Sequence, residues 1–371
     1  MPKMLPALPQ AFGNLKEVFL SAALSVQGKD NPQKLPKVAN SLVIMVDGLG
    51  WFNITKFAGH APFLTKQMTK GAKGYSSFPS TTAASIVSLA TGSSPSESGF
   101  FGYRLYDRTI GESVNMLTGL TPEQSVSYLK AEPITRAMRS SCEFHVVTKP
   151  EYLGSGFSAV TFPECAEHGE VDIERRFSAA LDLLNSGAGR VIYLYVPELD
   201  QTAHRSGSNS AEWIALLELV DREVKKVATL ANKKSGIVLT ADHGIVDVPN
   251  EQQFYLDDCE YLSGKLLDVG GDPRALFIYL QSGIDSVECL HSLNDWLDPV
   301  GRAFAASDIF DFTSELLPDI VILAARGRAG YHRDFAKAAS MRMIGQHGGL
   351  TDEEISIPIL RLAGYSSLLV P

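Results

Sequence analysis

The 371-residue sequence lacks the features that mark several common protein classes. It has only 4 cysteines and no Cys-x-x-Cys pair, which argues against a zinc knuckle or a disulfide scaffold and favours buried free thiols. No run of about 18 apolar residues occurs, so we expect no membrane partner. Lys and Arg number 33 against 42 Asp and Glu, and the net charge of -9 argues against a nucleic-acid polymer as partner.

Two catalytic motifs are also missing. The motif G-x-x-x-x-G-K-[ST] does not occur, which excludes a P-loop enzyme. A Ser-His-Asp set with the glycines of a nucleophile elbow is absent as well.

In "NLKEVFLSAALSV" (residues 14–26) the apolar part is short and follows Lys16 and Glu17, unlike a signal peptide. We interpret this stretch as an amphipathic helix of a cytoplasmic protein.

What the sequence does contain is an alternation of strand and helix patterns. Apolar, β-branched runs at 41–46, 190–196 and 235–241 predict buried parallel strands. Residues 172–187 and 210–236 have apolar side chains at the spacing of helices. Strands and helices that alternate in this way predict an α/β fold with a mostly parallel central sheet.

The stretch 250–340 has a different character. Its runs "RALFIYL", "SVECLHSLNDWL" and "PDIVILAA" predict a strand, a helix and a strand. We therefore predict a catalytic core of residues 1–249 and 341–371, with residues 250–340 inserted as a small α+β cap. In open α/β sheets the ligand lies beyond the carboxyl ends of the strands, and the candidate functional residues gather there.

Each predicted core strand is followed by residue types that bind metal ions. Asp47 follows the first strand, although an Asp at this place is more often an N-cap or a turn residue. Asp200 and His204 follow the second; on a helix they would share one face and could bind a divalent cation, or they form an ordinary surface pair. Asp242 and His243 follow the third. Three such strand ends at one edge of a sheet indicate a shared metal site.

Two further motifs carry candidate residues. His347 lies in the Gly-rich "GQHGG" and would by itself be a loop histidine. The stretch "SSFPSTTAASIVSLATG" (76–92) places Ser80, Thr81 and Thr82 at the start of a helix of small residues. Hydroxyls there usually cap the helix, but the same helix end also attracts anions. A Ser or Thr held over a metal ion can lose its proton and attack phosphorus.

Together these motifs resemble the alkaline phosphatase superfamily, and within it the type I phosphodiesterase/nucleotide pyrophosphatase family. The resemblance rests on Asp47, the Thr-rich helix start, Asp200-x-x-x-His204, Asp242-His243-Gly244 and Gly345-Gln-His347-Gly, which run in the family's order. It implies a three-layer αβα sandwich and two divalent metal ions, for which mixed carboxylates and imidazoles favour zinc over manganese. It assigns Asp200, His204 and His347 to the first ion and Asp47, Asp242, His243 and Thr82 to the second. Gly244 is expected to keep the backbone clear of the ion.

The resemblance also implies a nucleophile and two substrate-binding residues. The separation from the Thr-Gly helix end selects Thr82 as the nucleophile, with Thr81 as the alternative, while Ser80 is expected to shape the turn. The family's phosphate-binding Asn is replaced at the corresponding position by Tyr103, which Arg104 follows. Because a phenol or a guanidinium can bind a phosphoryl oxygen, we predict both as substrate-binding residues, and the choice between diesters and monoesters stays open.

The implied function is hydrolysis of small-molecule phosphate esters, nucleotides or phosphoanhydrides through a phosphothreonine. A sulfatase is disfavoured because the C/S-x-P-x-R setting is missing, and a phosphomutase because its nucleophile is Ser. A phosphonoacetate-hydrolase-like C–P hydrolase, a phosphomonoesterase and a metal or phosphate sensor remain as alternatives. Tyr103, Tyr106, Phe157 and Tyr255 either stack on a nucleobase or pack within the protein.

Overall fold

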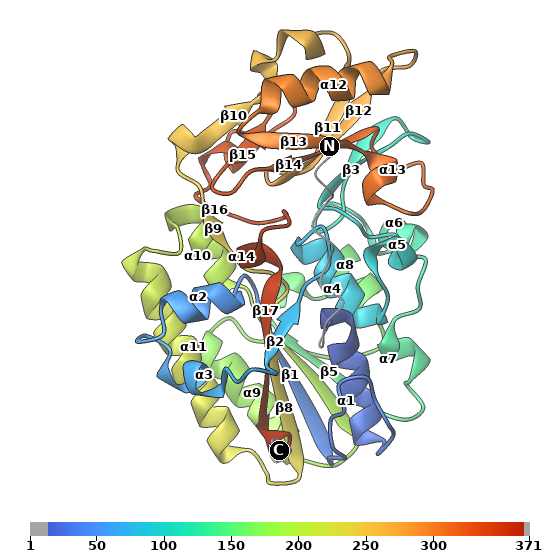
Figure 1. Ribbon diagram of the computed structural model, residues 1–371. Coiled ribbons are helices and arrows are strands. Elements are labelled where there is room, and N and C mark those ends of the chain that lie inside the picture. The colour runs from blue at the N-terminus through green and yellow to red at the C-terminus, as the bar shows by residue number, and fades with distance from the viewer. Residues whose placement is uncertain (1–13, 367–371) are drawn as a thin grey trace.

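The computed structural model describes residues 14–366, and a seven-stranded sheet forms its centre (Figure 1). The strand order is β2-β17-β8-β1-β7-β5-β6. Its parallel strands are β8 (Ser235–Thr240), β1 (Asn40–Val46), β7 (Arg190–Val196), β5 (Glu143–Thr148) and β6 (Ala166–Gly169). β17 (Ser356–Ala363) runs antiparallel to β8 and to β2 (Lys73–Tyr75). The three strands expected from apolar runs are the adjacent β8, β1 and β7, so the mostly parallel sheet is confirmed.

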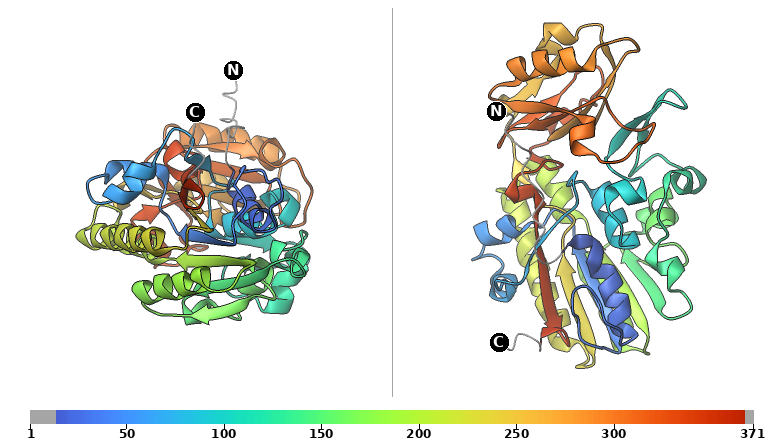
Figure 2. Two further views of the ribbon diagram at one scale, coloured as in Figure 1. Left: turned by 90° about the horizontal axis from the view of Figure 1, so that it is seen from below. Right: turned by 45° about the vertical axis from the view of Figure 1, so that its right-hand side comes forward.

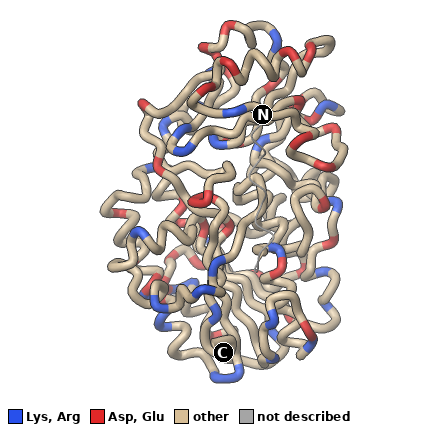
Figure 3. The backbone as a smooth tube through the Cα atoms, in the orientation of Figure 1, with Lys and Arg blue, Asp and Glu red and all other residues tan. Residues whose placement is uncertain are grey.

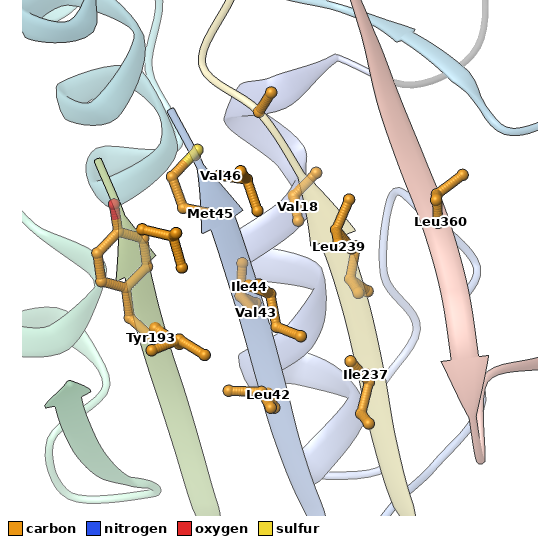
Figure 4. Close-up of a cluster of buried hydrophobic side chains, with 14 of the residues drawn as sticks. Val18, Leu42, Val43, Ile44, Met45, Val46, Tyr193, Ile237, Leu239 and Leu360 are labelled. Carbon is orange, nitrogen blue, oxygen red and sulfur yellow. The ribbon is translucent and has the colours of Figure 1, made fainter. Parts of the chain in front are cut away.

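The central strand β1 shows why these runs are so uniformly apolar. Every residue of β1 is buried, because side chains on both faces of the sheet are covered. Figure 4 shows Leu42, Ile44 and Met45 of β1 beside side chains of the two neighbouring strands and of α1 (Val18–Val26). A strand covered on both faces gains nothing from alternating polar residues, which explains the continuous apolar pattern.

Helices cover both faces of the sheet (Figure 2). α1 and α4 (Thr82–Thr91) lie on one face, and α9 (Ile173–Asn185) and α11 (Ala211–Leu230) on the other. The helices expected at 172–187 and 210–236 are therefore confirmed, although α11 ends earlier than expected. It ends at Leu230 because Ala231 adopts an extended backbone, which leads into β8. Within residues 14–366, none of the helices is both long and apolar enough to cross a membrane.

A second, antiparallel sheet forms the upper unit in Figure 1. Its strands are β11 (Leu266–Asp272), β12 (Ala275–Leu280), β14 (Ile320–Ala324) and β13 (Gly301–Ala305), in that order. α12 (Ser286–Leu297) covers one face with Cys289, Leu293 and Leu297. The strand, helix and strand expected within 250–340 all form. The limits of the cap itself stay a prediction, since a hairpin from outside that range, β3 (Arg104–Asp107) with β4 (Glu112–Asn115), also packs on this sheet.

Two small ladders form where the chain leaves and re-enters the core. β9 (Val246–Asp247) pairs with β16 (Gly345–Gln346), and β10 (Gln253–Tyr255) pairs with β15 (Ala329–Tyr331). The turn after β11 holds Arg274, whose buried guanidinium contacts the buried Glu354 carboxylate of α14 (Asp352–Ile355) at 2.8 Å. This ion pair ties the upper sheet to the core.

The remaining helices are short and lie around these two sheets. They are α2 (Trp51–Lys56), α3 (Pro62–Gln67), α5 (Pro95–Ser98), α6 (Pro122–Tyr128), α7 (Ile134–Ala137), α8 (Gly156–Thr161), α10 (Glu198–Ser206) and α13 (Ala306–Ile309). Lys and Arg are interspersed with Asp and Glu along the backbone (Figure 3). The four cysteines are free, and Cys165 is less buried than the other three.

Candidate metal centre and active site

The predicted metal ligands meet at the carboxyl ends of the central strands. Asp47 follows β1, Asp242 and His243 follow β8, and Asp200 and His204 lie on α10, directly after β7. His347, from the far end of the chain, follows β16 and stacks on His243 with 3.7 Å between ring centroids. Residues that are far apart in the sequence are thus brought to one buried place.

One group of potential ligands consists of Asp47, Asp242 and His243. One ligand atom from each lies within 4.8 Å of the others. His243 Nε2 is 3.6 Å from Asp47 Oδ1 and 3.4 Å from Asp242 Oδ2. This group has the same three side chains that the family resemblance assigns to the second ion.

A second group adjoins the first and shares His243 with it. The ligand atoms of Asp200, His243 and His347 lie within 4.8 Å of one another. His204 joins through Asp200, because its Nε2 is 3.2 Å from Asp200 Oδ2, and its ring centroid is 5.2 Å from that of His347. The structure therefore brings together Asp200, His204 and His347 as expected, and places the His243 ring between the two groups.

The carboxylate ligands are each held on one side only. Tyr195 of β7 donates a hydrogen bond to Asp47 Oδ2, and the Gly48 main-chain N–H donates one to Asp242 Oδ1 at 3.1 Å. Asp47 Oδ1, Asp200 Oδ1 and Asp242 Oδ2 are buried without a hydrogen bond in the described chain. Buried carboxylate oxygens without donors are costly unless a cation neutralises them, so these residues fit a divalent metal centre.

His204 and His347 are also held on one side, each through its Nδ1 atom. Nδ1 of His204 contacts the Gly345 carbonyl oxygen at 2.7 Å, and Nδ1 of His347 contacts the Ser80 carbonyl oxygen at 3.1 Å. A carbonyl can only accept, so Nδ1 carries the proton in both rings. In the neutral form of each ring, the Nε2 lone pair then faces Asp200, as a metal-binding imidazole requires.

The three buried carboxyl groups of the centre have shifted pKa values, because they lie close together and away from water. Burial, and then the charges of Asp242 and Asp200, raise the pKa of Asp47 well above its ordinary value. Burial also raises the pKa of Asp242 to about 6. Burial acts to raise the pKa of Asp200 too, but His204 outweighs it and the net shift is downward. A pair of divalent cations would relieve this mutual repulsion.

The pKa values of the three histidines are shifted in different directions, depending on their neighbours. Burial lowers the pKa of His243 to about 4, and burial together with His243 lowers that of His347 to about 3. Burial acts to lower the pKa of His204 as well, but the Asp200 carboxylate raises it to about 9. Two of the three rings are therefore neutral at physiological pH, which is the form that binds a metal ion.

Thr82 is the first residue of α4, with Thr81 as its N-cap. Its Oγ1 lies 3.2 Å from His243 Nε2, at the junction of the two ligand groups. The free N–H groups and the positive dipole end of the helix face the same place, which favours an anionic ligand. The Ser80 hydroxyl instead donates to the Gly349 carbonyl oxygen at 2.8 Å, which supports its expected role in the turn.

Gly244 has a packing role that the sequence did not indicate. A Cβ at Gly244 would lie 2.0 Å from the Glu353 carbonyl oxygen and 3.2 Å from the Gly50 Cα. The missing side chain makes room for the backbone of the chain end at α14, and the Gly244 N–H donates to the Glu354 carbonyl oxygen at 2.8 Å. Gly244 therefore serves close packing between chain segments.

A cavity of about 910 Å³ extends from the ligands toward the upper unit. Tyr103 and Arg104 both line it, as predicted substrate-binding residues should. The Arg104 guanidinium, however, pairs with Asp268 at 2.8 Å and donates to the Phe335 carbonyl oxygen at 3.2 Å. A phosphoryl oxygen would have to compete with these acceptors for Arg104.

Of the other aromatic candidates, Phe157 lines the cavity. Tyr106 packs on Tyr279 at 5.6 Å and Tyr255 on Tyr331 at 6.3 Å, so these two serve packing.

Sequence reasoning missed two residues at the site. Tyr195 lies within the apolar run of β7, where "YLY" is the only hint that one side chain is polar. Asp272 ends β11 after a Gly-Gly pair, lines the cavity and is only 7% exposed. Burial raises the pKa of Asp272 to about 7, against the lowering effect of His204 and of neighbouring donors. The Gly-Gly pair before Asp272 indicates a close backbone approach, but it does not indicate which part of the chain approaches.

Residues 41–338 match the family model for type I phosphodiesterase / nucleotide pyrophosphatase. The chain belongs to this family. Its membership and its fold also place it in the alkaline phosphatase superfamily and indicate a phosphoester hydrolase. A comparison with curated protein sequences finds no match.

Solved structures with a similar fold include two kinds of enzyme. Murine ectonucleotide pyrophosphatase / phosphodiesterase 5, in an inactive form with AMP, is 16% identical with a TM-score of 0.67, over 88% of each chain. The human protein of that name is also 16% identical with a TM-score of 0.67, over 87% of each chain. Phosphonoacetate hydrolase from Sinorhizobium meliloti 1021, in complex with phosphonoacetate, is 21% identical with a TM-score of 0.68, over 88% of this chain and 91% of that chain. At these identities the likeness shows the shared fold.

Proposed function

We propose that the protein hydrolyses phosphodiesters or phosphoanhydrides of small molecules, such as nucleotides, through a phosphothreonine at Thr82. The observation that carries this proposal is the position of Thr82 Oγ1. It lies at the N-terminus of a buried helix, 3.2 Å from the imidazole that two groups of potential metal ligands share. A hydroxyl in that place is next to the positive charge that a nucleophilic alkoxide needs.

Seven side chains would hold two divalent cations, and their chemistry suits zinc better than manganese. Asp200, His204 and His347 would bind one ion, and Asp47, Asp242, His243 and the Thr82 oxygen the other. When bound, such ions supply positive charge that lowers the pKa of a hydroxyl and neutralises phosphoryl oxygens.

The chain's own residues would act in two displacements at phosphorus. In the first, the Thr82 oxygen, having lost its proton to solvent, forms a bond to phosphorus while the bond to the leaving oxygen breaks. The leaving group departs with the electron pair of that bond. In the second, the oxygen of a water molecule forms a bond to phosphorus and gives up a proton to solvent, while the bond to Thr82 breaks and the Thr82 oxygen keeps its electron pair. The N–H groups at the start of α4 face the phosphoryl oxygens in both displacements.

The first experiment compares wild type with Thr82→Ala in the presence of zinc. We expect turnover of bis(p-nitrophenyl) phosphate to fall by about 10³-fold or more, because the covalent route is lost. Zinc content, measured by elemental analysis, should change little, since the other six ligands remain. Thr81→Ala serves as the matched control, because it removes the neighbouring hydroxyl, and it should retain most of the turnover.

Two results would contradict this proposal. Unchanged turnover in Thr82→Ala, or loss confined to Thr81→Ala, would exclude Thr82 as the nucleophile. Bound zinc in a wild-type protein that turns over no phosphorus substrate would favour the metal or phosphate sensor instead.

A C–P hydrolase is the second candidate, because a phosphonoacetate hydrolase shares the fold. A substrate panel separates the candidates: nucleoside diphosphate derivatives, cyclic nucleotides, phosphonoacetate and simple monoesters, each with zinc. We expect the diesters and anhydrides to have the highest kcat/KM. Phosphonoacetate as the best substrate would replace the present proposal with the second candidate.

A further inference from the structure

Asp272 brings a carboxylate from the upper sheet to the edge of the metal centre. It is the last residue of β11, and its Cβ packs beside Gly348, the residue that follows His347. A Cβ at Gly348 would lie only 2.7 Å from the Asp272 Cβ, so only a glycine at position 348 leaves room for the Asp272 side chain. The Thr81 side chain and the Tyr103 main-chain N–H also lie beside the Asp272 carboxylate.

This carboxylate is buried and incompletely paired. Asp272 is 7% exposed, and no well-formed hydrogen bond reaches its Oδ2 in the described chain. His204 is the positively charged neighbour that acts on Asp272, whereas the Arg104 guanidinium pairs with Asp268. Asp272 therefore adds a carboxylate beside Thr81, the residue before the proposed nucleophile, and one of its oxygens has no hydrogen-bond partner in the described chain.

The charges of the proposed centre balance without Asp272. Two divalent cations offset the carboxylates of Asp47, Asp200 and Asp242 together with one alkoxide at Thr82, while the imidazoles are neutral ligands. A diester brings one further negative charge to this centre, and a monoester or inorganic phosphate brings nearly two. The added carboxylate penalises the second charge more, because like charges repel strongly in a poorly hydrated site.

We propose that Asp272 is a specificity-determining residue that selects phosphoryl groups with a single negative charge and disfavours doubly charged ones. This inference rests on the proposed function and deepens it: the preferred substrates are diesters and phosphoanhydrides attacked at a phosphorus whose oxygens carry one charge. The same repulsion expels the doubly charged phosphate product and limits its inhibition of the enzyme.

The test uses the zinc-loaded full-length protein and the variant Asp272→Asn, which keeps the shape of the side chain and removes its charge. At about pH 9 the wild-type carboxylate is ionised. Isothermal titration calorimetry with inorganic phosphate should show binding that is at least about tenfold tighter in the variant, the size expected for one like charge about 12 Å away at an effective dielectric constant of about 20. The ratio of kcat/KM for p-nitrophenyl phosphate to that for bis(p-nitrophenyl) phosphate should rise by about tenfold as well.

Two variants control for fold and for net charge. Asp308→Asn removes an exposed carboxylate of α13 in the upper unit and should bind phosphate as the wild type does. Asp272→Glu keeps the charge and should retain the wild-type selectivity. If Asp272→Asn loses zinc, Asp272→Ser, which is also uncharged but smaller, takes its place.

Phosphate binding in both uncharged variants that stays within about twofold of the wild type would overturn the role of Asp272. An equal gain in Asp272→Glu would overturn it too, since the charge is unchanged there. Failure of the wild type to hydrolyse any diester would instead overturn the proposed function, while phosphate binding would still measure the effect of Asp272.

Discussion

Tyr195 shows how a side chain outside the proposed ligand set can orient one of its members, the Asp47 carboxylate. The Tyr195 hydroxyl donates to Asp47 Oδ2, which leaves Oδ1 as the one free oxygen of that carboxylate. The Tyr195 ring lies between those of Tyr193 and Tyr152, with centroids 6.2 Å and 5.9 Å away. The hydroxyl therefore acts on the ligand, while the ring keeps its own packing.

Tyr195→Phe should weaken zinc binding by about 10- to 100-fold, the usual cost of losing a partner that orients a metal ligand. The fold should be retained, since the ring remains. Zinc affinity is measured by competition with a fluorescent chelator. Tyr152→Phe is the matched control, because its hydroxyl bonds to the Gln201 side chain and contacts no proposed ligand. Equal affinity in Tyr195→Phe and wild type would contradict the role given to the hydroxyl.

At this scale the sequence predicts ligands better than it predicts their partners. Asp47, Asp242 and His243 could be located because they directly follow apolar runs. Tyr195 could not, because its contact spans 148 positions and the residue looks like an ordinary part of a buried strand. Asp272 could not either, because it lies in the upper sheet, whose placement over the centre no local pattern encodes.

Among the elements, α14 and the turn after β11 depend on one buried ion pair. Glu354 accepts from Arg274 at 2.8 Å and from the Gly349 N–H at 2.8 Å, and both charged side chains are fully buried. Arg274 also donates to the Ala325 carbonyl oxygen at 2.7 Å. Removing one partner of such a buried, well-bonded ion pair strongly destabilises the fold, because the other charge is left buried without a partner or water.

Glu354→Gln should therefore lower the free energy of unfolding by about 3–5 kcal/mol at neutral pH. Burial acts to raise the pKa of Glu354, but Arg274 and the hydrogen bonds outweigh it and lower the pKa from 4.5. A carboxyl whose pKa is depressed by folding contributes its full stability above the unfolded value and loses it as the pH falls through the folded value.

The difference between wild type and Glu354→Gln should thus be constant above about pH 5 and shrink as the solution is acidified below 4.5. Urea unfolding of both proteins across this range measures it. A difference that grows on acidification would show that Arg274 does not stabilise the Glu354 carboxylate.

The elements themselves were more predictable than their ends. The runs that became β1, β7 and β8 are buried on both faces, so their composition alone identifies them. α11 was expected to reach 236, since apolar spacing continues to about Leu230 and the first glycine or proline after it is Gly236. The antiparallel β17 pairs with both β2 and β8, and no local pattern states which strand a C-terminal run will join.

For the molecule as a whole, three buried carboxylates in one centre predict a strong dependence of stability on metal ions. Removal of the proposed zinc ions by EDTA should lower Tm by about 5 °C, because a ligand at about 1,000 times its Kd stabilises by about 4 kcal/mol. Differential scanning fluorimetry with and without added zinc measures the shift. Thr82→Ala should show the same shift, since the carboxylates remain. An unchanged Tm after verified zinc removal would contradict a structural contribution of the centre.

The arrangement of the two units was the least predictable feature. The sequence indicates a strand, a helix and a strand between 250 and 340, yet the upper sheet also packs on the β3–β4 hairpin, which lies near position 110. The Phe101, Phe277 and Phe310 rings that join these segments are far apart in the sequence, and their meeting is a property of the folded whole.

The contact between His347 and Ser80 has a consequence for how the protein is made. These residues are separated by 267 positions, and His347 reaches its place only after the chain has passed through the upper sheet. On the ribosome, β1, β7 and β8 can pair long before His347 is synthesised. Asp47, Asp200 and Asp242 can therefore come together before His347 is made, and the proposed metal centre can be completed only near the end of synthesis.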